Sequence, residues 1–355
     1  MTSPPDSVIP MTNEKKKSGC LPLVLFLALC VSVLLNVGLF SSQIGKSISA
    51  STAFSSGSMN SGQQGFEEVT VEEGTSKNTG RIALIEVLGV ISSSSPGELT
   101  DSMVNDAKVA LRQAKNDDTI RAVVLHIDSP GGEVTASDVI YNEVRKLREK
   151  KPVVIYMGSL AASGGYYIAC GGNYLMANDT TITGSIGVII QTLKYKELFG
   201  KIGVESIVFK SGAFKDILSG SRDMSEAEQQ YIQSLVMQTY DKFVGIVARE
   251  RQIPEETLRT GIADGRIISG KDAVGVKLVD ATGYIEDAFN KARELGNASG
   301  APVVQYKAQF KFGRLLRGFG MDSLANKKVE VTLGEGMLPR LESGRLYLLP
   351  SHYAQ

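Results

Sequence analysis

The chain has 355 residues, of which 43% are hydrophobic and 21% are charged, and its formal net charge is zero. This composition is typical of a globular protein with a sizeable core and excludes a largely disordered chain. The balanced charge argues against a dedicated nucleic-acid binder, which would carry a basic excess. With only 3 cysteines and 2 histidines, neither a disulfide framework nor a His/Cys metal site is expected. We therefore expect no cofactor and no metal.

The N-terminal region has the pattern of a membrane anchor. Residues 1–20 are polar and contain a run of lysines that begins at Lys15, whereas residues 21–40 are almost entirely apolar and carry no charge. A segment of this length can span a bilayer as a helix. The preceding lysines keep the N-terminus in the cytoplasm and send the rest of the chain across. A cleaved signal peptide and a lipoprotein attached at Cys30 are the alternatives, which the length of the apolar segment and the bulky Leu29 disfavour.

The next part of the chain alternates between strand and helix patterns. Residues 41–65 are rich in Ser and Gly and indicate a tether, which we extend to residue 80. Strand-like runs follow at 82–90, 120–127 and 152–157, and helical patterns lie between them at 100–115 and 133–150. Strands that alternate with helices at this spacing predict an α/β fold.

Shorter elements follow in the second half. We predict strands at 174–177, 181–183, 187–190 and 203–210, and helices at 193–202, 225–251, 253–259, 269–274 and 284–295. Ser225 and Glu228 form a capping-box pair at the start of the longest helix. We therefore expect one folded domain over 81–299 and an extension over 300–355. Its apolar-basic stretch 338–349 could pair with a neighbour, lie on a membrane or lie in a groove.

Ser163 lies among small residues, Ala161-Ala162-Ser163-Gly164-Gly165, between a strand-like run and a helical pattern. Such a turn can present the serine Oγ to a ligand, because glycines allow close approach. The start of the helix also directs free N–H groups and a positive dipole end to the same place. An ordinary N-cap serine is the alternative interpretation.

A second loop, Asp-Ser-Pro-Gly-Gly at 128–132, follows a strand-like run and opens a helix. Its glycines, Gly131 and Gly132, would leave backbone N–H groups exposed, and such groups can hold an oxyanion. An ordinary strand-to-helix turn is the alternative. The loop is not a P-loop, because the chain contains no Gly-x-x-x-x-Gly-Lys-Ser/Thr pattern.

A serine nucleophile needs a base. His126 lies inside a strand-like run and His352 lies close to the C-terminus, so neither suits a Ser-His-Asp triad. Lys215, in Ser-Gly-Ala-Phe-Lys-Asp at 211–216, is the best candidate, since small and apolar neighbours can favour an uncharged amine. A solvated lysine paired with Asp216 is the alternative.

Ser185 is a third serine beside glycine, in Thr-Gly-Ser-Ile-Gly at 183–187. Its hydroxyl could hold a lysine amine in place. The alternative is an ordinary turn serine.

Together these stretches resemble the bacterial signal peptide peptidase A family of membrane-anchored serine–lysine peptidases, in its short, single-copy form. The matching pieces are D-S-P-G-G at 128–132, A-A-S-G-G-Y-Y at 161–167, T-G-S-I-G-V at 183–188 and S-G-A-F-K-D at 211–216, in the same order. The stretch 273–280 also fits, although Lys277 stands where the family usually has glycine. The resemblance covers residues 81–295 and the anchor.

The resemblance implies an endopeptidase that degrades cleaved signal peptides and other apolar peptides through an acyl-enzyme. Ser163 would be the nucleophile, Lys215 the general base, and Ser185 a hydrogen-bond partner of the lysine amine. The oxyanion hole would be formed by N–H groups of Gly131, Gly132 and Gly164. The implied fold is a Clp-protease/crotonase-like spiral of ββα units, preceded by one transmembrane helix.

The resemblance also implies how the protein assembles. Family members form rings or domes in which serine and lysine come from neighbouring copies, so we expect a homo-oligomer. It would be held in the bacterial cell membrane by residues 21–40, with its catalytic domain on the extracytoplasmic side. The expected partners are peptide substrates, not nucleic acid.

Three other functions fit parts of the pattern. A related serine–lysine membrane protease acting on stomatin-like proteins would share the dyad. A crotonase-type acyl-CoA enzyme would use the same oxyanion loops, but CoA is cytoplasmic. A non-catalytic membrane scaffold would keep the fold alone.

Overall fold

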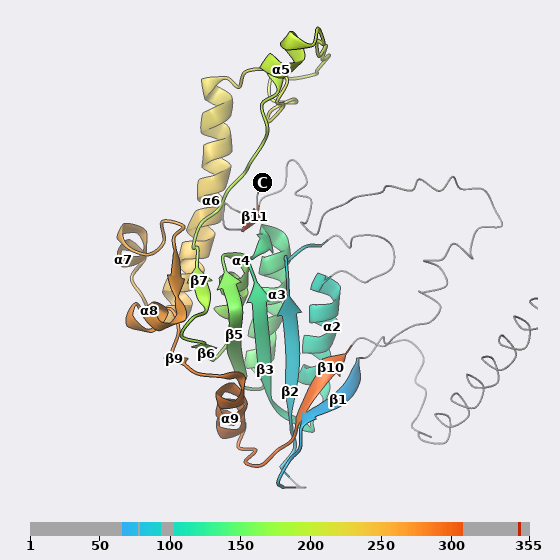
Figure 1. Cartoon of the computed structure of the whole chain (residues 1–355), viewed down its shortest axis with the longest axis vertical. Helices are drawn as coiled ribbons and strands as arrows, with labels where there is room; N and C mark the ends of the chain where they lie inside the picture. The colour runs from blue at the N-terminus through green and yellow to red at the C-terminus, as the bar shows by residue number, and fades with distance from the viewer. Residues whose placement is uncertain (1–65, 77–78, 94–102, 308–346, 349–355) are drawn as a thin grey trace, which may run out of the picture. The chain divides into compact units, whose positions relative to one another are not determined.

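The computed structural model describes residues 66–76, 79–93, 103–307 and 347–348, and the expected α/β class is confirmed (Figure 1). Its centre is a nine-stranded sheet, in which β7 (Ile182–Gly184) pairs with β5 and β8 (Ile267–Ser269) pairs with β7. Along the main path the order is β1 (Glu67–Glu72), β10 (Val303–Lys307), β2 (Arg81–Leu88), β3 (Ile120–Ser129), β5 (Val153–Ala162), β6 (Tyr174–Ala177) and β9 (Ala281–Thr282).

The central strands β2, β3 and β5 are parallel and almost continuously apolar. Parallel strands that are covered on both faces have continuously apolar sequences, because neither face meets water. Alternate residues of β2 enter different cores: Ile85 and Val87 belong to one cluster, and Ile82 and Leu84 to the other. The predicted strands at these positions are confirmed, although β5 runs five residues further than expected, up to Ala162 beside Ser163.

Helices cover the two faces unequally. The larger core packs under α2 (Met103–Asn116), α3 (Val134–Arg148), α4 (Gly164–Ala169) and the C-terminal part of α6 (Glu226–Arg251). The smaller core packs under α9 (Ile285–Leu295). The short helices α7 (Glu255–Thr260) and α8 (Gly270–Gly275) follow α6, close to their predicted positions. The capping box of Ser225 and Glu228 is present as predicted.

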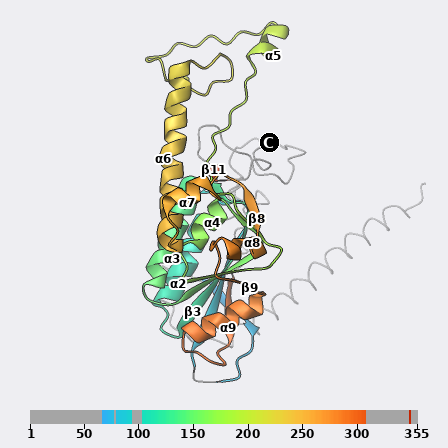
Figure 2. The same ribbon diagram turned by 90° about the vertical axis from the view of Figure 1, so that its left-hand side faces the viewer.

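The segment between β7 and α6 leaves the sheet and forms an arm. Figures 1 and 2 show α5 (Lys196–Lys201) at the end of this arm, away from the sheet and near the level of the N-terminal end of α6. We define the arm as residues 191–222. The strand predicted at 203–210 is wrong, because these residues lie on the exposed arm, where no neighbouring strand pairs with them. The strand predicted at 187–190 is also absent from this described region.

Several elements were not expected. β1 and β10 pair with each other and extend the sheet at β2. Two very short strands, β4 (Gly132–Glu133) and β11 (Tyr347–Leu348), form a separate antiparallel pair. In the described ranges no helix is long and apolar enough to cross a bilayer. The anchor predicted at residues 21–40 lies outside those ranges.

Candidate active site

Ser163 joins β5 to α4 in an unusual backbone conformation, with φ 54° and ψ −113°. Its N–H donates to Gly184 O at 2.9 Å, and its carbonyl accepts from Tyr167 N–H at 2.8 Å. A non-glycine residue at positive φ is strained and persists only where its surroundings hold it. Here β7 on one side and α4 on the other hold the Ser163 backbone.

The Ser163 hydroxyl is buried and unpaired. The residue is 1% exposed, and its Oγ has no hydrogen-bond partner within the described part of the chain. Buried hydroxyls normally find a partner, so an unpaired one needs an explanation. An N-cap serine would use its oxygen to accept from the helix, but Ser163 makes no such bond to α4. The ordinary capping interpretation therefore fails, and the Oγ is free to react.

The loop 128–132 lies directly beside this serine and is held by backbone hydrogen bonds. Ile91 N–H donates to Gly131 O at 2.8 Å, and Glu133 N–H donates to Ile91 O at 2.8 Å. Gly131 has φ 107°, and its N–H donates to Ser129 Oγ at 3.1 Å. Because the N–H of Gly131 already has a partner, it is a poorer oxyanion donor than its neighbour Gly132.

Close packing requires glycine at Gly132 and Gly164. A methyl group on Gly132 would lie 1.9 Å from Ile91 O. A methyl group on Gly164 would lie 2.5 Å from Ser137 Oγ and 3.1 Å from Gly132 N. The two glycine backbones therefore approach each other next to Ser163. Ile91 and Ser137 were missed by the sequence reasoning, because nothing in their local sequence indicates that they touch this loop.

Ser185 directly follows β7, just as Ser163 directly follows β5. β7 pairs with β5 in a register that places Gly184 opposite Ala162, so the two serines follow at neighbouring positions. Ser185 is 4% exposed and has φ 51°, and its N–H donates to Arg266 O at 2.8 Å. The structure thus brings the backbones of the glycine loop, Ser163 and Ser185 close together.

Lys215 lies elsewhere, exposed on the arm. The predicted alternative, an ion pair with Asp216, is not formed. Asp216 instead binds Arg222 Nη2 at 2.6 Å and Lys210 Nζ at 2.8 Å. Since Ser163 Oγ has no partner in the described chain, a single subunit does not bring Lys215 to Ser163.

Arg222 fixes the segment that carries Lys215. Its guanidinium binds Asp216 on one side and Glu228 at the start of α6 on the other. Hydrogen bonds from Arg222 and Lys210 hold the pKa of Asp216 well below its ordinary value. Hydrogen bonding to Arg222 likewise lowers the pKa of Glu228 to about 2. Both carboxylates are therefore ionised at neutral pH and tie the arm to α6.

Other ionisable groups are used structurally. His126 Nδ1 lies 3.3 Å from Glu86 Oε1, and its ring packs near Tyr156 with centroids 5.5 Å apart. His352 lies outside the described residues. In the part of the chain that the structure describes, no three or more His, Cys, Asp or Glu side chains form a group that could hold a metal.

Comparisons with known proteins bear on the chemistry of this site. Residues 145–299 match the family model for peptidase family S49, and residues 90–185 match that for Clp protease. The chain is 37% identical over 273 residues to an Enterococcus faecium protein named as a signal peptide peptidase SppA, covering 76% of this chain and 77% of that protein. The chain belongs to peptidase family S49.

Other S49 relatives differ in length. A protein of Haemophilus influenzae named Protease 4 is 34% identical over 226 residues, which are 63% of this chain and 36% of that protein. An Arabidopsis thaliana protein named as a chloroplastic serine protease SPPA is 32% identical over 225 residues, 61% of this chain and 32% of that protein. As an S49 member with a Clp-protease-like domain, the protein is a serine peptidase.

Proposed function

We propose that this serine peptidase degrades cleaved signal peptides and other apolar peptides with a Ser163–Lys215 dyad. The observation that carries the proposal is the buried, unpaired Oγ of Ser163, held in a strained conformation beside two glycine backbones. Strain and an unsatisfied polar atom cluster at functional sites. The substrate class rests on the Enterococcus faecium relative named as a signal peptide peptidase.

The chemistry assigns one role to each side chain. The uncharged Lys215 amine takes the proton from Ser163 Oγ while the oxygen attacks the scissile carbonyl carbon. The carbon–nitrogen bond then breaks, the leaving amine takes the proton from the lysine, and an acyl-enzyme remains. The same amine then takes a proton from a water molecule, whose oxygen attacks the acyl carbon. The bond between that carbon and Ser163 Oγ breaks, Lys215 returns the proton to Oγ, and the second product leaves as a carboxylic acid. Ser185 follows the strand β7, which pairs with β5, and we assign to its hydroxyl a hydrogen bond that orients the amine.

The developing negative charge needs donors that are already in place. We assign this role to the N–H groups of Gly132 and Gly164, whose backbones meet next to Ser163. Gly131 contributes by shaping the loop, because its own N–H donates to Ser129 Oγ. The start of α4 adds its positive dipole end at the same position.

The dyad is completed between subunits. The arm exposes large apolar side chains, including Phe209 at 95%, Ile207 at 76% and Leu193 at 75%. Large apolar side chains that are exposed together on one segment indicate an interaction site. We propose that the arm packs on a neighbouring copy and delivers Lys215 to that copy's Ser163, which requires a closed ring or dome. Burial in this interface would favour the uncharged amine.

Residues 21–40 are proposed to anchor the protein in the bacterial membrane, with the cytoplasmic tail at 1–20 and the tether at 41–80. The apolar, uncharged stretch and the preceding lysines support this topology. The peptidase domain at 81–299 would then face the extracytoplasmic side. Signal peptides left in the membrane after secretion would be within its reach.

A serine-reactive fluorophosphonate probe tests the dyad together with hydrolysis of an apolar fluorogenic peptide. We expect Ser163→Ala to lose both labelling and hydrolysis, and Lys215→Ala to lose roughly 10²–10⁴-fold in rate, as expected for a general base. Ser159→Ala on β5 and Lys201→Ala on the arm are matched controls, because both residues are exposed on the same elements. Labelling that persists in Ser163→Ala, or full activity in Lys215→Ala, would overturn the assignment.

A further inference from the structure

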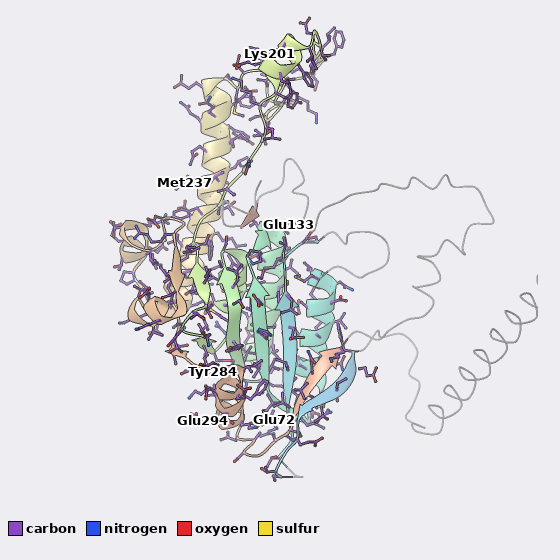
Figure 3. The ribbon with its side chains drawn as sticks, in the orientation of Figure 1. Glu72, Glu133, Lys201, Met237, Tyr284 and Glu294 are labelled. Carbon is purple, nitrogen blue, oxygen red and sulfur yellow. The ribbon has the colours of Figure 1, made fainter. Side chains whose placement is uncertain are left out.

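Glu133 is a buried charged residue beside the glycine loop that the proposed mechanism does not use. It follows Gly132 on β4, lies directly before α3, and is 6% exposed. Figure 3 shows Glu133 at the opposite end of the sheet from Glu72 and Glu294. A charge buried to this degree costs free energy unless hydrogen bonds satisfy it, so the partners of Glu133 indicate its role.

The side chain of Glu133 holds the segment that follows β2. Its Oε1 accepts from Ser92 Oγ at 2.9 Å, and its Oε2 accepts from Ser93 N–H at 3.3 Å. Both oxygens act as acceptors, as they do in an ionised carboxylate. The same segment contains Ile91, whose carbonyl oxygen would lie 1.9 Å from a methyl group on Gly132. The carboxylate thus ties down the stretch of chain against which Gly132 packs.

The backbone of Glu133 bonds in two further directions. Its N–H donates to Ile91 O at 2.8 Å, and its carbonyl accepts from Ser137 Oγ on α3 at 2.9 Å. Ser137 is fully buried, and its Oγ would lie 2.5 Å from a methyl group on Gly164. Glu133 therefore contacts the residue that packs on Gly132 and also the residue that packs on Gly164.

We propose that Glu133 is a positioning residue that sets the separation of the two oxyanion donors, the N–H groups of Gly132 and Gly164. The inference rests on the proposed oxyanion hole, and Glu133 acts through Ile91 and Ser137 instead of on the substrate. A carboxylate suits this position because α3 begins at the next residue, where the positive end of the helix dipole stabilises it. The donors stabilise charge that develops only in the transition state, so a change in their separation lowers kcat and leaves KM unchanged.

The test compares full-length Glu133→Ala and Glu133→Gln with the wild type on an apolar fluorogenic peptide. We expect Glu133→Ala to lose roughly ten- to a hundredfold in kcat with KM unchanged, because a shift of about 1 Å in catalytic groups has effects of that size. Glutamine should recover most of the loss, since its amide oxygen can accept from Ser93 N–H while its nitrogen donates to Ser92 Oγ. A Glu133→Gln protein as slow as Glu133→Ala would overturn the inference.

Glu143→Ala is the matched control. Glu143 is also a buried carboxylate, 7% exposed, and it bonds to Arg112 and Lys146. It lies on the same helix α3, about 15 Å further along the helix axis at about 1.5 Å per residue. Its removal should lower the thermal midpoint and leave kcat close to the wild-type value. If Glu133→Ala changes kcat no more than Glu143→Ala does, Glu133 has only a structural role and the inference fails.

A peptide aldehyde separates this inference from the proposed chemistry. Ser163 Oγ, whose proton passes to Lys215, adds to the aldehyde carbon, and the resulting oxyanion occupies the hole. We expect Glu133→Ala to weaken aldehyde binding by the same factor as kcat/KM. The corresponding peptide alcohol, which forms no adduct, should bind as it does to the wild type. Equal aldehyde affinities would refute the positioning role, whereas a wild-type protein that forms no adduct at Ser163 would refute the proposed function itself.

Discussion

At the scale of single residues, the site depends on one strained serine. Ser163 has a positive φ because β7 and α4 fix its backbone, and such strain typically costs about 1–3 kcal/mol. The strained conformation therefore lowers the stability of the fold, and in the proposed mechanism it directs the Ser163 Oγ to the reaction site. This is the relation between stability and activity that functional sites commonly show.

Ser163→Gly should accordingly relieve strain while it removes the nucleophile. Glycine adopts positive φ without a steric penalty but has more entropy to lose on folding. We expect Ser163→Gly to be about 1 kcal/mol more stable than Ser163→Ala, with both inactive. Urea unfolding followed by far-UV circular dichroism measures this difference. A Ser163→Gly protein that is clearly less stable than Ser163→Ala would show that the conformation is not strained.

A second prediction concerns the contact between Gly164 and Ser137. Gly164→Ala should cost activity roughly a hundredfold, because the new methyl would lie 2.5 Å from Ser137 Oγ and displacement of catalytic groups by about 1 Å has effects of that size. Combining it with Ser137→Gly removes the obstructing hydroxyl and should restore part of kcat/KM. If the double variant is as impaired as the sum of the single variants predicts, the contact does not position the site.

At the scale of elements, the arm is the part whose structure serves function more than stability. Most of its large apolar residues are exposed, and no residue of the arm contributes to the cores of the described domain. Arg222 joins it to α6 through Asp216 and Glu228. Changes here should alter catalysis without unfolding the sheet.

Arg222→Gln should therefore reduce kcat/KM by roughly tenfold or more, because Lys215 is next to the carboxylate that Arg222 holds. The thermal midpoint should stay close to that of the wild type. Arg222→Lys keeps the charge but loses the bidentate geometry, and should recover only part of the activity. A large drop in thermal midpoint for Arg222→Gln would contradict the view that the arm is independent of the core.

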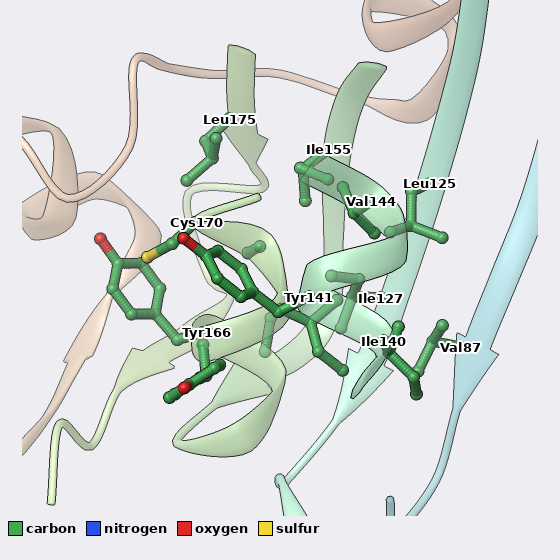
Figure 4. Packing of buried hydrophobic residues seen from close by; sticks show 14 of the residues in the cluster. Val87, Leu125, Ile127, Ile140, Tyr141, Val144, Ile155, Tyr166, Cys170 and Leu175 are labelled. Carbon is green, nitrogen blue, oxygen red and sulfur yellow. The ribbon is translucent and has the colours of Figure 1, made fainter. Parts of the chain in front are cut away.

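The core around α4 gives a prediction on pH. Figure 4 shows Cys170 packed between Tyr166 and the neighbouring apolar side chains. Burial raises the pKa of Cys170 from 9.0 to about 12. A raised native pKa means that stability is complete below the pKa of the unfolded chain and falls as pH rises through the interval from 9 to 12.

Between pH 7.5 and 9.5, the free energy of unfolding of the wild type should thus fall by about 1 kcal/mol more than that of Cys170→Ala. Urea unfolding at the two pH values gives the comparison. Tyr141 in the same cluster also has a pKa raised to about 12 by burial, but tyrosines of the unfolded chain titrate mainly above this interval. Equal losses in the two proteins would contradict the assigned burial of the thiol.

Much of the fold could be predicted from local patterns. β3, β6 and α6 lie where apolar runs and the capping box indicated, because their signals are contained in consecutive residues. β1 and β10 were missed because they are stabilised by pairing between residues that are far apart in sequence, such as Val69 with Gln305 and Ile82 with Val303. On the arm the error was the reverse, because a strand was predicted where none forms. Val204–Phe209 has a strand-like composition but no partner strand in the described chain.

In the candidate site, too, features carried by consecutive residues could be predicted, whereas features that arise from tertiary packing could not. The sequence indicated the glycine loop, Ser163 and Ser185, and the sheet register brings them together. It could not indicate Ile91 or Ser137, which touch the site only through tertiary packing. Nor could local patterns predict that Asp216 would turn to Arg222 and leave Lys215 exposed.

At the scale of the whole molecule, the single chain contains the parts of a peptidase site without joining them. Ser163 is buried where β5 ends, whereas Lys215 belongs to the arm, on which large apolar side chains such as Phe209 are exposed. The proposed dyad therefore requires an assembly in which one copy supplies the serine and the next supplies the lysine. Closed symmetry would then give every copy one complete site.

The most direct test mixes two inactive proteins. Ser163→Ala retains Lys215, and Lys215→Ala retains Ser163, so random mixed assemblies regain complete sites wherever the two meet in the right order. We predict about a quarter of wild-type kcat after dissociation and reassembly of an equal mixture, with the separate variants inactive. A mixture that stays as inactive as its components would contradict the shared site.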